Sequence, residues 1–267
     1  MNTSVRLVYR IPLGAAKLVS SLMVVAALFV GQMVGASLAS ASAHLPSVAN
    51  SAPCITSYGI HYYGVTSWCG TNQGALAEIE TVHLYSSYGN HISNELWDID
   101  TTHDCSGYGI SWMESGEAVE YQQTGNWYFY ALCPPGGSFT SNFLQQPPSS
   151  EVYQFPTYVI AHSGYQQYTI TEDHPNGSTN WSYTFGGMGS FTPSEIEIGL
   201  ETTANDYNDA HSDTAYFEYN EYYSTNGNWY FQPVTGVIFD NKPPYFAWYQ
   251  APNGSGNHGG TAYTTCC

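Results

Sequence analysis

Residues 194–201 read Ser-Glu-Ile-Glu-Ile-Gly-Leu-Glu, and this alternation of apolar and polar residues is typical of a β-strand. Successive side chains of a strand point to opposite faces of the sheet. One face would carry Ile196, Ile198 and Leu200. The other would carry Glu195, Glu197, Gly199 and Glu201. Carboxylates on one face repel one another, so at least one should have a raised pKa. The same alternation also fits an outer strand whose acidic face is solvated.

A second stretch has the same period and also presents a glutamate. Residues 110–118 read ISWMESGEA, which predicts a strand. Ile110, Trp112, Glu114 and Gly116 would share one face. If the two strands line one groove, Glu114 lies near the acidic face of residues 194–201.

Strand patterns recur along most of the chain. A helix is suggested only at Asn72–Glu80 (NQGALAEIE), and strand patterns rich in Tyr, Trp, Phe, Val and Ile follow from about residue 81. The sequence Gly-Asn-Trp-Tyr-Phe occurs at 125–129 and again at 227–231, each time as a turn that leads into a strand. Short strands at intervals of 10 to 15 residues predict an all-β fold, namely an antiparallel β-sandwich or jelly roll.

The first 43 residues are typical of a secretion signal. Arg6, Arg10 and Lys17 precede an apolar stretch at 18–38, and Ala41-Ser42-Ala43 matches a cleavage site. The length of the apolar stretch leaves an uncleaved anchor as the alternative. We therefore expect a secreted protein, free of the membrane after cleavage. The further divisions that we expect are an N-terminal segment joining the sandwich (44–90), the sandwich core (91–250) and a Gly/Asn-rich tail (251–267).

The charge balance excludes several partners. The chain of 267 residues has 4 Lys and Arg against 21 Asp and Glu, a formal charge of −17. Without the leader, one base remains against 21 acids, which gives 1 − 21 = −20. Such a chain cannot neutralise the phosphates of a nucleic acid or bind an anionic membrane surface. Its carboxylates repel one another less in acid, so the composition favours an acidic environment, although ordinary acidic secreted proteins share it.

Six cysteines in an exported chain indicate disulfides. Pairing of sequence neighbours suggests Cys54–Cys69 and Cys105–Cys133, and leaves the adjacent Cys266 and Cys267 unplaced. The Cys and His residues lack the spacing of a zinc site. We therefore expect no metal and no cofactor.

Several short motifs follow one another in an order that resembles the fungal glutamic peptidases called eqolisins. In chain order they are Trp97-Asp98-Ile99-Asp100, Cys105, Met113-Glu114-Ser115-Gly116, the aromatic run 127–131, the hairpin strand Thr179–Gly186 and Glu197-Ile198-Gly199-Leu200-Glu201. The resemblance covers roughly residues 95–220. Eqolisins are concanavalin-like sandwiches that act in acid. The resemblance thus implies a concanavalin-like antiparallel β-sandwich with curved sheets, and a polypeptide substrate.

The resemblance also implies a pair of catalytic residues. In eqolisins a catalytic Gln precedes a small residue and Gly, and the catalytic Glu lies in an E-W-x-x-E-like segment. Here Glu114 stands where the Gln would be, and Glu197 and Glu201 keep the later spacing without the Trp. A Glu/Glu pair is more similar to the neprosin-type glutamic peptidases. Glu197 would be the base that activates water, and Glu114 the protonated donor to the carbonyl oxygen, although the two roles are interchangeable.

Such a pair works only while it holds one proton, so activity should be confined to acid and lost near neutral pH. Around the pair we expect substrate contacts from Trp97, Trp112, Tyr128, Glu195 and Glu201.

Two other functions fit the same residues. Jelly-roll glycoside hydrolases use paired glutamates and aromatic platforms on a polysaccharide. A carbohydrate-binding or lectin-like sandwich would use the aromatic residues alone, and its glutamates would be incidental. A Ser/His/Asp hydrolase is disfavoured, because the chain has no G-x-S-x-G motif and no α/β rhythm. We expect a monomer.

Overall fold

A computed structural model describes residues 62–120, 123–232, 236–239, 245–250 and 259–264. These residues form strands and connecting loops and contain no helix. In this part of the chain, accordingly, no helix is long and apolar enough to cross a membrane. All of the described residues belong to one compact unit that spans residues 46–267.

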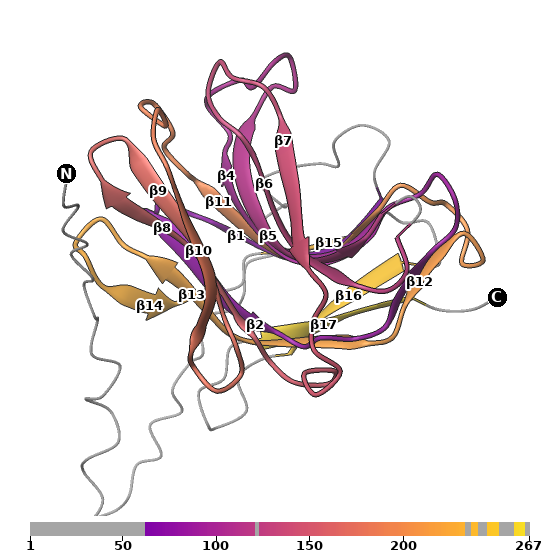
Figure 1. Cartoon of the computed structure of the whole chain (residues 1–267). Coiled ribbons are helices and arrows are strands. Elements are labelled where there is room, and N and C mark those ends of the chain that lie inside the picture. Colours follow the sequence, from indigo (N-terminus) through magenta and orange to yellow (C-terminus); the bar gives the residue numbers. More distant parts are fainter. Residues whose placement is uncertain (1–61, 121–122, 233–235, 240–244, 251–258, 265–267) are drawn as a thin grey trace, which may run out of the picture. The chain divides into compact units, whose positions relative to one another are not determined.

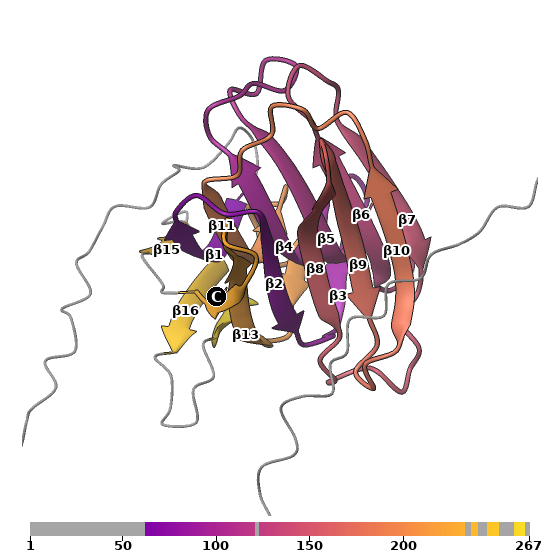
Figure 2. The same ribbon diagram turned by 90° about the vertical axis from the view of Figure 1, so that its left-hand side faces the viewer.

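The strands form two large antiparallel sheets and one small one (Figures 1 and 2). The first sheet has the order β15-β1-β11-β4-β5-β6-β7. Its strands are β1 (Tyr62–Cys69), β4 (Ile92–Asp100), β5 (Ser111–Val119), β6 (Trp127–Cys133), β7 (Thr140–Gln145), β11 (Glu195–Thr202) and β15 (Gly236–Phe239).

The second sheet has the order β10-β9-β8-β2-β13-β17-β16, and β14 pairs with β13. Its strands are β2 (Gly74–Ile79), β8 (Thr157–Gly164), β9 (Gln167–Asp173), β10 (Thr179–Phe185), β13 (Ala215–Tyr223), β14 (Trp229–Phe231), β16 (Tyr245–Gln250) and β17 (Gly259–Thr264). The small sheet pairs β3 (Leu84–Ser86) with β12 (Ala210–Ser212).

The core lies between the two large sheets, where each contributes its apolar face. The first sheet supplies Leu96, Met113, Ile196 and Ile198, among others. The second supplies Ala77, Ile160, Ile170 and Phe217. All are buried, so the sandwich is held together by apolar surface removed from water. The predicted all-β antiparallel sandwich is confirmed.

The centre of the first sheet is buried on both of its faces. All nine residues of β4 and all eight of β11 are buried. Residues 194–201 alternate as predicted, with the isoleucines in the core, but the glutamates on the other face are not solvated. The interpretation as a solvated outer strand is therefore wrong. The carboxyls of β11 lie in a region that excludes water.

Two segments differ from their predicted structure. Residues 74–79, within the suggested helix, form β2, whose Ala75, Ala77 and Ile79 are buried in the core. Alternate residues of this segment face the core, as a strand requires. This tertiary packing outweighs the helix propensity of Ala, Leu and Glu. Residues 259–264 of the expected tail form β17, which pairs with β13 and β16.

One predicted disulfide is present. Cys105 and Cys133 are bonded, with a Cα–Cα distance of 5.6 Å, and so fix the β4–β5 loop to the end of β6. The other predicted pair involves Cys54, which lies outside the described residues, as do Cys266, Cys267 and the expected signal at 1–43.

Candidate active site

Glu197, Trp97 and Glu114 form one row across three adjacent strands. Glu197 of β11 is opposite Trp97 of β4, and Trp97 is opposite Glu114 of β5. Opposed residues in a sheet share a face, so both carboxyls project to the same side, away from the core. Glu114 is 8% exposed and Glu197 is 7% exposed. The two predicted catalytic residues therefore lie on one nearly dry face, on the two strands that flank β4.

Two tryptophans hold the Glu114 carboxyl. The indole of Trp112 donates to Glu114 Oε2 at 3.0 Å, and Trp97 also donates to this carboxyl. Burial raises the pKa of Glu114 to about 7, although both indole hydrogen bonds lower it. The indoles therefore orient a carboxyl that keeps its proton in weak acid.

Glu195 lies beside Glu197 on the same face of β11 and is fully buried. Its two carboxyl oxygens have no hydrogen-bond donor among the described residues. Two buried carboxylates this close would repel each other, so at least one keeps its proton. Burial raises the pKa of both groups, and the charge of Glu197 raises that of Glu195 further. Glu195 thus holds the proton and Glu197 is the member that ionises first.

A third carboxyl on this face, Glu95 of β4, was not found by sequence reasoning. It is 1% exposed, accepts a hydrogen bond from Ser93 and has a raised pKa, chiefly because of burial and then because of Glu114. Ser93 Oγ also lies 3.1 Å from His91 Nε2. A polar chain thus leads from His91, near the surface, to the carboxyl beside Glu114.

Gly116 makes room for Glu95. The two residues are opposite each other. A Cβ on Gly116 would lie 2.6 Å from Glu95 Cβ and 2.2 Å from the Asn94 carbonyl oxygen. The glycine at position 116 is therefore required by the close approach of β4 and the packing of Glu95 over β5.

Gly116→Ala should destabilise the fold by about 1–3 kcal/mol, because the added methyl overpacks a site bounded by backbone. Gly186→Ala is the matched control, since a Cβ there meets no atom within 4 Å. Urea denaturation of both variants measures the effect. Equal stability of the two would contradict the packing described for Glu95.

An aromatic wall stands beside Glu114. Trp112 stacks on Phe139 with ring centroids 5.8 Å apart and meets Tyr108 edge-on at 5.3 Å. Tyr108 comes from the β4–β5 loop that the Cys105–Cys133 disulfide anchors, and Phe139 from the β6–β7 loop. Both are about half exposed, so they are positioned to contact a ligand that reaches Glu114. No motif or spacing in the sequence distinguishes Tyr108 or Phe139 from the many other aromatic residues of the chain.

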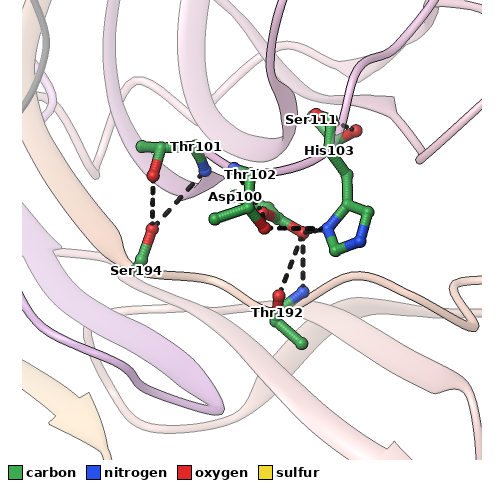
Figure 3. A network of polar contacts seen from close by, with 7 residues as sticks. All are labelled: Asp100, Thr101, Thr102, His103, Ser111, Thr192 and Ser194. Atoms are coloured by element: carbon green, nitrogen blue, oxygen red, sulfur yellow. Dashed lines mark hydrogen bonds and ion pairs between the residues drawn. The ribbon is translucent and has the colours of Figure 1, made fainter.

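A polar network at the end of β4 fixes the start of β11 (Figure 3). The backbone N–H of Thr192 donates to Asp100 Oδ2 at 2.8 Å, and His103 Nδ1 lies 2.7 Å from the same oxygen. Next to it, the hydroxyls of Thr101 and Ser194 are 2.9 Å apart. Burial would raise the pKa of Asp100, but its hydrogen bonds outweigh burial and hold the pKa below the usual value. An ionised Asp100 thus ties the β10–β11 connection to β4.

The remaining predicted site residues divide between the two faces. Glu201 lies on the same face as Glu197, opposite Ser93. Glu195 is fully buried beside Glu197, too deep for contact with a substrate. Tyr128 was predicted to contact substrate, and this is wrong. It is opposite Glu117, on the core face, where it is fully buried and its hydroxyl donates to Glu151 Oε2 at 2.6 Å.

Glu117 is the centre of a second set of acids, between the sheets. Thr81 and Tyr158 both donate to its Oε1, and Asn126 donates to its Oε2 at 2.8 Å. Burial raises the pKa of Glu117 to about 7 despite these hydrogen bonds. Burial likewise raises the pKa of Glu172, on β9, to about 8.

No Lys or Arg occurs among the described residues, because Arg6, Arg10, Lys17 and Lys242 all lie outside them. The buried carboxyls of this part of the chain thus have protons, hydrogen bonds and, at Asp100, a histidine to offset their charge, and no Lys or Arg. Within the same residues, no three His, Cys, Asp or Glu side chains are grouped so as to hold a metal ion.

Comparisons with protein-family models and with curated proteins find no match. Among solved structures, the chain is similar to scytalido-glutamic peptidase bound to a transition-state analogue inhibitor (TM-score 0.51, 12% identity) and to the same peptidase with a peptide-based analogue (TM-score 0.52, 11% identity). It also matches SCP-B, an eqolisin, in complex with the tripeptide Ala-Ile-His (TM-score 0.48, 12% identity). Each match covers 76% of this chain and 98% of the other. The chain therefore has the β-sandwich fold of the eqolisin glutamic peptidases, as its motifs predicted.

Proposed function

We propose that the protein is an exported glutamic endopeptidase in which Glu197 and Glu114 hydrolyse peptide bonds. The row Glu197–Trp97–Glu114 carries this proposal, because it places two carboxyls of raised pKa on one water-poor face. The glutamic peptidase fold supports a polypeptide substrate. A monomeric protein, without nucleic acid or membrane contacts, is part of the proposal.

The chemistry uses one proton on the pair. Ionised Glu197 takes a proton from water as the water oxygen attacks the carbonyl carbon of the peptide. The O–H of Glu114 donates to the carbonyl oxygen as negative charge develops there. The C–N bond then breaks, and the proton on Glu197 passes to the leaving amine. Glu195 keeps its own proton, and a hydrogen bond donated by that proton to Glu197 would favour the ionised form of the base.

The indoles determine which atom of Glu114 faces the substrate. Trp97 and Trp112 donate to the carboxyl, so they bind oxygen lone pairs and leave the O–H free to turn toward the substrate. A Gln amide in the same place would accept from the indoles through its oxygen and donate through its NH₂. This explains in physical terms how Glu stands at a position where eqolisins have Gln.

A non-catalytic binding sandwich explains the carboxyls less well. Burying Glu95, Glu114, Glu195 and Glu197 on one face costs stability unless they stay protonated. A sugar-stacking module needs aromatic platforms and gains nothing from these groups. The cluster therefore favours catalysis over the lectin-like alternative.

The pH dependence tests the proton count. With the pKa of Glu114 and that of Glu197 raised to about 7, the one-proton form is scarce in strong acid and in alkali. We expect a bell-shaped plot of kcat/KM against pH with its maximum in weak acid to neutral solution. This expected optimum lies nearer to neutral pH than the activity confined to acid that the sequence alone predicts. A rate that rises steadily from pH 6 to pH 3 would contradict Glu197 as the base.

The substrate class is tested by incubating the protein with casein, xylan and β-glucan across pH 3–8. Release of new amino groups from casein, without new reducing ends from either glycan, is the expected result. Reducing ends from a glycan alone would favour the two-glutamate glycoside hydrolase. If none of the three is cleaved, the non-catalytic binding sandwich is favoured over both enzymes.

A further inference from the structure

A cavity lies at one end of the sandwich. It has a volume of about 360 Å³, within the range of about 300–1,000 Å³ typical of small-ligand pockets. Its walls come from the β1–β2 connection, the β8–β9 hairpin, the β10–β11 connection and the β13–β14 turn (Figure 1). None of the carboxyls in the Glu197–Glu114 row lines it.

The lining is polar but almost uncharged. Except for His162, every lining side chain is neutral, in a chain with 21 acidic residues. The polar lining groups are amides and hydroxyls, including Asn72, Gln166 and Thr192. Asp98 and Asp100 lie behind this lining and are fully buried, so neither reaches a ligand. A charged ligand would find no counter-ion here, and the chemistry favours a neutral molecule rich in hydrogen-bonding groups.

Aromatic rings form the apolar part of the wall. Tyr168 meets Phe191 edge-on, with centroids 5.1 Å apart, and His162 at 5.3 Å. Tyr165, at the tip of the β8–β9 hairpin, is 88% exposed. An exposed tyrosine ring beside amides and hydroxyls suits the apolar face of a sugar ring.

The β8–β9 turn is built to hold Gln166 at the mouth of the cavity. Gln166 has φ of 54°, a left-handed conformation that Gly adopts at lower cost. Its carbonyl oxygen accepts from the N–H of Met188 at 3.2 Å. A Cβ on Gly189 would lie 2.9 Å from Gln166 Nε2, so Gly189 leaves space for this side chain. A glutamine thus occupies a backbone conformation that favours glycine, and a glycine stands where any larger residue would displace the glutamine side chain. Both choices keep Gln166 in place.

Backbone pairing separates a sugar from a peptide as the ligand. A bound peptide strand pairs with free backbone N–H and C=O groups. Here three N–H groups of the lining are already paired internally. Asn72 N–H donates to the Pro193 carbonyl at 3.1 Å, Gln73 N–H to Tyr223 at 2.7 Å and His162 N–H to Gln73 at 2.8 Å. These parts of the wall therefore offer a ligand their side chains, as in saccharide sites.

We propose that this cavity is a binding site for a neutral saccharide, with Tyr165 stacking on a sugar ring and Gln166 and Gln73 hydrogen-bonding to hydroxyls. The site is independent of the carboxyl row. Together the two would direct a peptidase to glycan-bearing material.

Calorimetric titration with neutral hexasaccharides tests the proposal. Cellohexaose, xylohexaose, laminarihexaose and chitohexaose are titrated into the full-length protein after signal removal, carrying Glu197→Gln so that turnover does not interfere. We expect saturable binding of at least one, weakened about tenfold or more by Tyr165→Ala. Tyr88→Ala is the control, since Tyr88 is 73% exposed and outside the cavity lining, and should leave affinity unchanged.

Gly189→Val should also weaken binding, because it displaces Gln166 while leaving Tyr165 in place. Binding of no hexasaccharide, or binding that Tyr165→Ala leaves intact, would overturn the proposal. So would binding of a capped tripeptide that Tyr165→Ala abolishes. Because the catalytic variant is used throughout, none of these outcomes depends on whether the protein cleaves peptides.

Discussion

Glu197→Gln is expected to lower kcat/KM for peptide hydrolysis by about 10²–10⁴-fold, the usual contribution of a general base. An amide cannot take a proton from water, while its size and its contact with Glu195 are nearly unchanged. Glu114→Gln should retain activity within about tenfold, because the amide still donates to the carbonyl oxygen. Its pH profile should also lose the alkaline limb, since an amide does not titrate near pH 7.

Glu201→Gln is the matched control. Glu201 lies on the same strand and face as Glu197 and is equally buried, at 7% exposure, but it stands opposite Ser93 and not Trp97. Because Glu201 is expected to contact the substrate and not to take part in the chemistry, Glu201→Gln should raise KM and leave kcat close to that of the parent. Equal losses in Glu197→Gln and Glu114→Gln would refute the division of roles, and full activity in both would refute the pair.

The free energy of unfolding should fall by several kcal/mol between pH 4 and pH 9. The pKa of Glu117 is about 7 in the fold against 4.5 as a free side chain, and that of Glu172 is about 8. The folded state therefore binds more protons than the unfolded state in this interval. The stabilisation is fully present below pH 4.5 and is lost as the pH rises through 7 and 8.

Glu117 alone accounts for about 3 kcal/mol of this change, from the difference between its two pKa values. Glu117→Gln should remove that share. The amide can accept from Asn126 through its oxygen and donate to the hydroxyls of Thr81 and Tyr158. The variant should thus fold, with a flatter dependence of stability on pH. Urea denaturation at pH 4, 6 and 8 measures both proteins.

Ser115→Ala serves as the control for Glu117→Gln, because it removes a buried hydroxyl from the same strand and face but no titrating group, and should leave the slope unchanged. A parent protein whose stability rises from pH 4 to pH 8 would contradict a buried, protonated Glu117.

Local pattern was enough to predict the strands that carry the site. Residues 194–201 and 110–118 each alternate with period two, so the face of Glu197 and that of Glu114 followed from sequence. Cys105 and Cys133 bracket two adjacent strands, and pairing of sequence neighbours found their disulfide. The motif order within 95–220 indicated the eqolisin fold although identity with the solved structures is only 11–12%.

The other features depend on which strands are neighbours. Residues 74–79 have the composition of a helix, and only their place between β8 and β13 makes them a strand. Tyr128 belongs to an aromatic run with no polar alternation, so its face was undetermined until β6 paired with β5. Glu95 belongs to no motif in the sequence, so nothing there marks it as part of the site. Its role follows from the register that sets it over Gly116 and beside Glu114.

The Asp100 network joins two regions that would otherwise be separate. Thr192 lines the cavity, and Glu195 follows it by three residues at the start of β11, beside Glu197. Asp100 and Thr101 hold the segment between them to β4. One carboxylate thus anchors both a wall of the cavity and the start of the strand that carries Glu197, so loss of the Asp100 carboxylate should disturb both regions together.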